Sequence, residues 1–126
     1  MDYKNIKGDV MKEKKITKAS IAKEEKRILK EQDKKFALDI KARDEFKCVI
    51  CGEFKNLHTH HILPREQKEV RHALLNGITL CCLHHKFSLK VSPHKNAFEF
   101  FVWLAEHRPI QFQFCKEHIQ RDYKGV

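Results

Sequence analysis

The sequence contains no run of about eighteen or more apolar residues, the length that a membrane-spanning helix requires. Lys and Glu recur near its start, where a secretory signal peptide would need an apolar stretch. We therefore expect no transmembrane helix and no signal peptide, and a soluble, intracellular (cytoplasmic) protein with no membrane partner. Because the cytoplasm is reducing, the five cysteines are not expected to form disulfide bonds, and we interpret their spacing first as metal ligation.

Glycine and proline are scarce, and residues 1–47 contain a single glycine, Gly8, and no proline. Apolar residues recur in this segment at the spacing of one helix face: Ile21, Ile28, Leu29, Phe36 and Ile40. The pattern predicts an arm to about Ile16 and then a helix to about Asp44. Because the apolar stripe is thin, we expect only the last turns to pack on a domain. The rest is either a solvated helix or an arm on a nucleic-acid backbone.

The composition changes at Phe46, where cysteine and histidine begin and the segments become short. We therefore divide the chain into a charged N-terminal arm and helix over residues 1–45 and a domain over residues 46–126. The stretch "FKCVICGEFKNLHTHHIL" predicts a tight cysteine turn followed by a strand.

Two further sequence signals predict where elements of the domain begin and end. Asn76-Gly77 stands between apolar pairs and predicts a turn between strands. The C-terminal segment predicts two helices separated at Arg108-Pro109, because proline cannot continue one helix but suits the first turn of the next.

A Cys-x-x-Cys turn, Cys48 to Cys51, is followed by Gly52 and can grip one tetrahedral ion with two thiolates. Cys81-x-x-His84 has the matching spacing and would complete a Cys3His site, a donor set that suits structural Zn²⁺. The alternative is that the cysteines are small buried apolar residues and free thiols.

The other cysteines fit this site less well. Cys82 is out of register with the knuckle spacing, and we expect it to pack beside the site. Cys115-x-x-His118 lies on a predicted helix without a glycine turn, so we assign these two residues to helix core and surface rather than to a metal.

From Cys48 to about His94 the sequence resembles the HNH endonucleases, nucleases with a ββα-metal core built around a zinc-bound knuckle. The resemblance rests on "CVIC", "HHILP", "NGITLC" and the "HH" of "CCLHHK", in this order, and covers under half of the chain. It implies an α+β fold: a treble-clef-like ββα-metal core with a structural zinc, flanked by N- and C-terminal helices. Small members of this kind are common in phages, so the resemblance also suggests a phage-encoded protein acting in a bacterial host.

The resemblance implies a role for each residue that matches the motif. His60 would be the first ligand of a catalytic metal, His61 the general base and His85 a second ligand. Asn76 would be the middle residue of the motif, holding the returning loop against the base. The third ligand would be His94 if this chain carries an insertion, and water otherwise.

These residues suit phosphodiester hydrolysis. A neutral His61 can accept a proton from water near neutral pH, since the ordinary pKa of histidine is about 6.5. A divalent ion can meet the charge on the phosphate and the departing 3′ oxygen. Histidine and water ligation suits Mg²⁺ poorly on its own, whereas Mn²⁺, Ni²⁺, Co²⁺ and Zn²⁺ are acceptable. Neighbours in a strand point to opposite faces, so His60 and His61 serve one site only if the strand ends or kinks there, and Pro64 shortly after favours an end.

The formal net charge of +9 favours an acidic partner, and DNA is the partner that the resemblance implies. Arg65 and Arg71 are candidate phosphate contacts, because a guanidinium fork matches phosphate geometry. His58 and His72 have no assigned partner and are expected at the surface.

Two alternatives to the nuclease stay open. A non-catalytic, zinc-stapled nucleic-acid-binding module would need the Cys3His set but not His60, His61 or His85. An adaptor could dock on a phage packaging or recombination protein through residues 14–44, alone or alongside nuclease activity. The sequence carries no signal for an oligomeric state.

Overall fold

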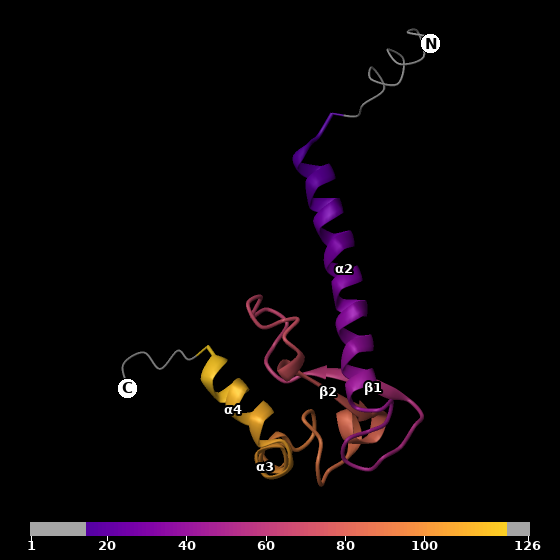
Figure 1. Cartoon of the computed structure of the whole chain (residues 1–126), viewed down its shortest axis with the longest axis vertical. Coiled ribbons are helices and arrows are strands. Elements are labelled where there is room, and N and C mark those ends of the chain that lie inside the picture. Colours follow the sequence, from indigo (N-terminus) through magenta and orange to yellow (C-terminus); the bar gives the residue numbers. More distant parts are fainter. Residues whose placement is uncertain (1–14, 121–126) are drawn as a thin grey trace, which may run out of the picture. The chain divides into compact units, whose positions relative to one another are not determined.

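A computed structural model describes residues 15–120. Within these residues, helices accompany a two-stranded antiparallel sheet, so the predicted α+β class is confirmed (Figure 1). The elements, in chain order, are α2 (Lys18–Arg43), β1 (Leu57–His61), the 3-10 turn η1 (Leu74–Asn76), β2 (Gly77–Cys81), the π-helical turn η2 (Leu83–Phe87), α3 (Ala97–His107) and α4 (Pro109–His118).

The long helix predicted to end near Asp44 is confirmed as α2. The arm predicted before it lies, through residue 14, outside the described residues. Compact packing divides the chain inside α2, between Glu31 and Gln32, so the C-terminal part of this helix belongs to the same unit as the sheet.

The first turn of α2 is capped by two side chains. Thr17 Oγ1 accepts a hydrogen bond from the Ser20 N–H (3.1 Å), and Ser20 Oγ accepts one from the Thr17 N–H (2.9 Å). This reciprocal pair satisfies donors that a helix start leaves free. Residues 18–32 are exposed, whereas Phe36 and Ile40 are buried, so only the last turns pack, as the thin apolar stripe predicts.

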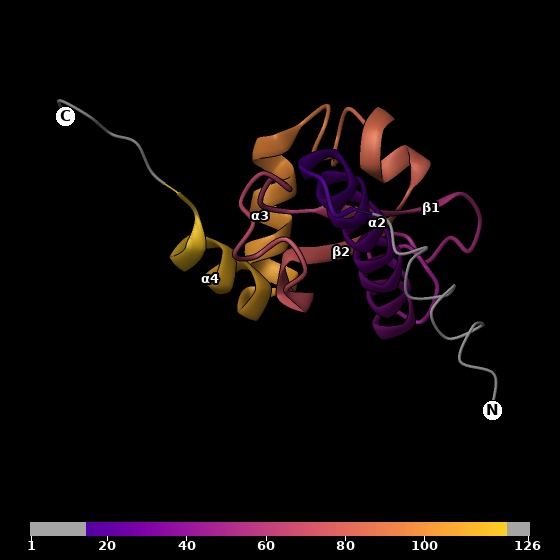
Figure 2. The same cartoon turned by 90° about the horizontal axis from the view of Figure 1, so that it is seen from above.

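The two faces of β1 meet different elements. Thr59 Oγ1 donates to the Ala37 carbonyl (3.2 Å), and the His61 ring stacks on Phe36, so this face lies against the C-terminal half of α2 (Figure 2). Because strand residues alternate, His58 and His60 occupy the opposite face. The antiparallel register pairs His60 with Ile78, and all residues of β2 are buried.

The predicted Asn76-Gly77 hairpin turn is wrong. Asn76 ends η1 and is fully buried, while Gly77 is extended (φ −124°, ψ 151°) and begins β2. The strands are joined by the longer segment 62–76. Glycine is needed at this position for space: a Cβ on Gly77 would lie 2.6 Å from Phe36 Cζ and 2.7 Å from Ile40 Cγ1. Its missing side chain therefore lets α2 approach the start of β2.

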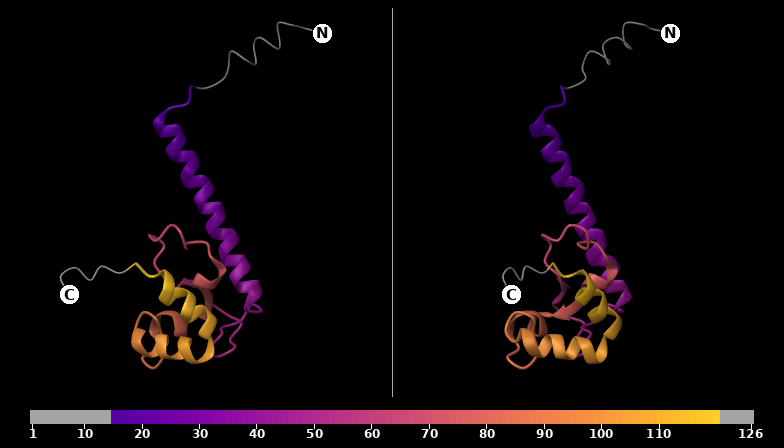
Figure 3. Two further views of the ribbon diagram at one scale, coloured as in Figure 1. Left: turned by 60° about the vertical axis from the view of Figure 1, so that its left-hand side comes forward. Right: turned by 90° about the vertical axis from the view of Figure 1, so that its left-hand side faces the viewer.

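The two predicted C-terminal helices are confirmed as α3 and α4, which pack against each other (Figure 3). Asn96 caps α3 by accepting a hydrogen bond from the Glu99 N–H (3.3 Å), and Pro109 begins α4. Phe100 and Leu104 are fully buried in the core beside the sheet. Among the described residues, no helix is both long and apolar enough to cross a membrane.

A buried carboxylate joins three of these elements. Asp44 Oδ2 accepts a hydrogen bond from the Thr79 N–H of β2 (2.9 Å) and pairs with the Arg43 guanidinium (2.9 Å). Arg108, between α3 and α4, approaches Asp44 Oδ1 at 3.4 Å. These contacts fix the end of α2 to the sheet and to the junction of the last two helices.

We expect Gly77→Ala to destabilise the domain by about 1–3 kcal/mol, because the added methyl overpacks against Phe36 and Ile40. Urea unfolding followed by circular dichroism measures this cost. The control is the same substitution in an Ile40→Ala background, where the vacated space should accept the methyl and reduce its cost. Equal costs in both backgrounds would contradict the close approach of α2 to β2.

Candidate metal centres

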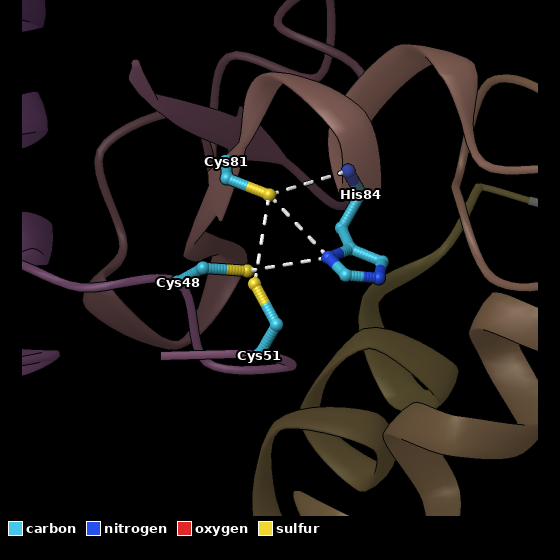
Figure 4. Close-up of side chains that lie close together, drawn as sticks. All are labelled: Cys48, Cys51, Cys81 and His84. Carbon is cyan, nitrogen blue, oxygen red and sulfur yellow. Dashed lines mark hydrogen bonds between the residues drawn. The ribbon is translucent and has the colours of Figure 1, made fainter. Parts of the chain in front are cut away.

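The four donors predicted for a structural zinc lie together in the structure (Figure 4). Cys48 and Cys51 belong to the turn after α2, Cys81 ends β2 and His84 lies in η2. The turn is tight because Gly52 adopts a positive φ of 78° and its N–H donates to the Cys48 carbonyl (2.8 Å). Segments far apart in the sequence thus supply one cluster.

The distances within this cluster suit tetrahedral coordination. Zinc–ligand distances of about 2.3 Å for sulfur and 2.0–2.1 Å for nitrogen place two sulfurs about 3.8 Å apart and a sulfur and a nitrogen about 3.6 Å apart. Cys51 Sγ lies 3.7 Å from Cys81 Sγ. His84 Nδ1 lies 3.8 Å from Cys48 Sγ and 3.3 Å from Cys81 Sγ. This Cys3His cluster could therefore hold a structural metal such as zinc.

The two buried thiols of the cluster differ in their pKa. Burial raises the pKa of Cys81 to about 11. Burial opposes ionisation of Cys48 as well, but hydrogen bonds from backbone groups, including those of Cys81 and Cys51, bring its pKa below the usual value. A cation among the sulfurs would favour both thiolates, because a coordinating thiol gives up its proton.

The remaining cysteines of the described chain lie outside this cluster. Cys82 is half-buried, and its N–H donates to the Asn56 carbonyl (2.9 Å). Cys115 is buried in the core, where burial raises its pKa to about 11. His118 is exposed on the same helix and donates from Nδ1 to the Phe114 carbonyl (2.8 Å). The assignment of Cys115 and His118 to core and surface is confirmed.

A second donor cluster consists of His60 from β1, His85 from η2 and His94 from the segment before α3. His60 Nδ1 lies 3.1 Å from His85 Nε2, and His94 Nε2 lies 3.0 Å from the same atom. Two nitrogens on one tetrahedral ion are about 3.3 Å apart. The structure therefore brings His94 to the other two histidines, and this set also fits a metal.

The surroundings of two rings in this second cluster disfavour their charged form. Burial, followed by repulsion from His85 and His94, lowers the pKa of His60 to about 3. Burial, and then the neighbouring His94, lowers the pKa of His85 to about 4. Neutral imidazoles keep the lone pairs that a metal requires.

His61 is held by two contacts. Its ring stacks on Phe36 with centroids 4.7 Å apart, and its Nε2 lies 3.0 Å from the Arg71 carbonyl oxygen. A carbonyl can only accept, so Nε2 carries the proton and Nδ1 is left with the lone pair of the neutral ring. Burial is the main cause of a pKa below the ordinary value in this histidine.

The second cluster and His61 open on the same cavity, whose volume is about 420 Å³. It is lined by Asp33, Thr59, His60, His61, Pro64, Arg65, Glu66, His85 and His94. β1 ends at His61, and so the two adjacent histidines reach one space although they leave the strand on opposite faces. A histidine with a lowered pKa and three side chains that could bind a metal therefore line one cavity.

Asn76 acts on the backbone beyond His61 rather than on a histidine ring. Its Oδ1 accepts from the Leu63 N–H (2.6 Å), and its Nδ2 donates to the carbonyls of Leu63 (3.2 Å) and Val70 (3.1 Å). The Ile62 N–H donates to the Asn76 carbonyl (2.9 Å). These bonds tie the end of β1 to the start of β2.

The two arginines predicted to contact phosphate have different surroundings. Arg65 lines the cavity. Arg71 instead forms a fork with Asp33, with Nε–Oδ1 at 3.0 Å and Nη2–Oδ2 at 2.6 Å, and its side chain is 17% exposed. His72 Nε2 lies 2.7 Å from Asp33 Oδ1, so His72 has a partner that sequence reasoning missed. The Arg71 fork, with a smaller contribution from His72, lowers the pKa of Asp33 to about 2.

His58 is the other histidine that was expected at the surface without a partner, and the structure corrects this. It is half-buried, and its Nδ1 lies 2.9 Å from His85 Nδ1. The signal that could have found it is the strand period: His58 precedes His60 by two positions and shares its face of β1.

Comparison with known protein families, with curated proteins and with solved structures found no match. The donor clusters and the cavity beside them are therefore the features from which a function is inferred.

We expect Cys51→Ser to lose the zinc of the Cys3His cluster and to lower the melting temperature sharply, because a domain of this size draws much of its stability from a structural ion. Cys51 is exposed, so lost packing cannot account for such an effect. Metal analysis and thermal melts measure both quantities. Cys82→Ser is the matched control and should keep the metal; equal metal content in the two variants would argue against the Cys3His assignment.

Proposed function

We propose that the protein is a metal-dependent endonuclease of the HNH type, which hydrolyses phosphodiester bonds in DNA. The observation that carries this proposal is the shared cavity, where His61 lies next to the cluster of His60, His85 and His94. In this proposal β1, β2 and η2 correspond to the ββα-metal core, and the Cys3His cluster staples that core with zinc.

His61 is the proposed general base. The Arg71 carbonyl holds its Nε2–H, which leaves Nδ1 free to take a proton from water. Stacking on Phe36 limits rotation of the ring, so the lone pair keeps one direction. The Asp33 fork fixes the Arg71 side chain and supports the segment that supplies this carbonyl.

The histidine cluster is the proposed site of the catalytic ion. His60, His85 and His94 offer three imidazole nitrogens and no carboxylate, a donor set that suits Mn²⁺, Ni²⁺, Co²⁺ or Zn²⁺ better than Mg²⁺. Three protein donors leave a coordination position for substrate, as catalytic sites require. An ion bound there would supply a Lewis acid for the phosphate and the leaving 3′ oxygen.

The substrate assignment rests on charge and on the lining of the cavity. The formal net charge of +9 favours a polyanion, and Arg65 is placed to meet a phosphate that enters beside His61. Arg71 is the weaker candidate for a phosphate contact because Asp33 already occupies its guanidinium fork. We therefore assign Arg71 to orienting the base and Arg65 to binding DNA.

We expect His61→Ala to reduce cleavage of supercoiled plasmid by about 10²–10⁴-fold, the usual contribution of a general base. The zinc-loaded protein is assayed with Mg²⁺, Mn²⁺, Ni²⁺, Co²⁺ or Zn²⁺ in turn, and nicked and linear products are resolved on a gel. His107→Ala is the matched control, because His107 lies on α3, where its ring stacks on Trp103 and its Nδ1 lies 3.0 Å from the Trp103 carbonyl oxygen.

A wild-type protein that binds plasmid but cuts it with none of these ions would refute the nuclease. A zinc-stapled nucleic-acid-binding module would then be the function that is left, since it needs Cys48, Cys51, Cys81 and His84 only.

A further inference from the structure

The two ring nitrogens of His85 have different neighbours. Its Nε2 faces His60 Nδ1 at 3.1 Å and His94 Nε2 at 3.0 Å. Its Nδ1 faces His58 Nδ1 at 2.9 Å, with the two rings nearly perpendicular at 80° and their centroids 5.1 Å apart. His85 thus presents one nitrogen to the donor cluster and the other to a histidine that is outside it.

The geometry of β1 explains why the His85 ring can contact both His58 and His60. His58 and His60 lie on the same face of β1 because they are two residues apart, and η2 places His85 opposite both. The Ser92 hydroxyl also donates to the His85 carbonyl (2.9 Å), which fixes the backbone of this residue. Within residues 15–120, the hydrogen-bond and ring contacts of the His85 side chain are with His58, His60 and His94.

The contact between His58 Nδ1 and His85 Nδ1 decides which nitrogen of His85 carries its proton. A neutral imidazole has one N–H and one lone pair, and only the lone pair can bind a metal. If His58 donated to His85 Nδ1, the proton of His85 would lie on Nε2 and would point into the donor cluster. If His85 Nδ1 donates to His58, then Nε2 carries the lone pair and faces His60 and His94.

We propose that His58 is a positioning residue, which accepts the Nδ1–H of His85 and so holds the ring in the tautomer whose Nε2 can bind a metal. This role requires His58 to carry its own proton on Nε2. It rests on the metal site of the proposed function, and it adds a residue that acts through His85 without binding the ion. Metal-bound histidines generally have such a partner, and its loss typically weakens metal binding about 10–100-fold.

The test is Co²⁺ titration of the full-length, zinc-loaded protein, with binding followed by visible absorption. We expect His58→Phe, which keeps a ring but accepts no hydrogen bond, to weaken Co²⁺ binding by about 10–100-fold. His58→Asn, whose Oδ1 can accept near the position of Nδ1, should restore most of the affinity. His107→Phe is the matched control. The absence of a sulfur-to-cobalt charge-transfer band shows that the Cys3His cluster keeps its zinc in every variant.

A second measurement reads the tautomer directly. Imidazole nitrogen NMR of the protein should show the His85 proton on Nδ1 in the wild type and in His58→Asn. In His58→Phe the two tautomers should be mixed, and a purely structural role for His58 would not produce this change.

The outcomes separate the two proposals. Co²⁺ binding that is lost in His85→Ala but unchanged in His58→Phe would overturn the role of His58 alone, and so would a His58→Asn variant as weak as His58→Phe. Co²⁺ binding that is unaffected by His85→Ala would remove the metal site, and with it both the role of His58 and the proposed nuclease.

Discussion

Three hydrogen bonds from the buried side chain of Asn76 hold the chain where β1 ends, and the cavity depends on that ending. Asn76 accepts from Leu63 and donates to the carbonyls of Leu63 and Val70. Because the strand stops at His61, two adjacent histidines can reach the same space. An unpaired amide in the core would cost about 1–3 kcal/mol, so these bonds also oppose any slip of the segment. Asn76 therefore supports the site through the backbone.

The two faces of the small sheet contact different elements, α2 on one side and η2 on the other. On one face, α2 supplies Phe36 as a stacking surface for His61 and Asp33 as a partner for Arg71. On the other face, β1 presents His58 and His60 to η2. Gly77 allows the first arrangement, since any side chain there would hold α2 away from the strands. A sheet of two five-residue strands thus separates the residues that orient the proposed base from the side chains that could bind a metal.

Local signals in the sequence were enough for α2, the cysteine turn, β1 and the split before Pro109, because spacing and backbone chemistry decide such features. Spacing also indicated the Cys3His set. The contacts of His72 and Arg71 with Asp33 could not be predicted, since they depend on how α2 meets the sheet. The strand period could have placed His58 on the same face of β1 as His60, but not in contact with His85 of η2. The Asn76-Gly77 turn was predicted wrongly for a related reason. The sequence shows a local preference for a turn, but Gly77 is needed as an extended residue because the last turns of α2 pack directly against it.

His84 and His85 are neighbours in η2, yet each belongs to a different donor cluster. A π-helical turn is a rare conformation, and ordering it costs free energy. In the proposed protein with both ions, the ion that binds first would bear that cost, and the second would find the turn already in place. The two sites would then be thermodynamically linked, and because such linkage is reciprocal, each ion would raise the affinity of the other site. Binding of the two ions would be cooperative, so zinc at the Cys3His cluster would strengthen metal binding at the histidine cluster.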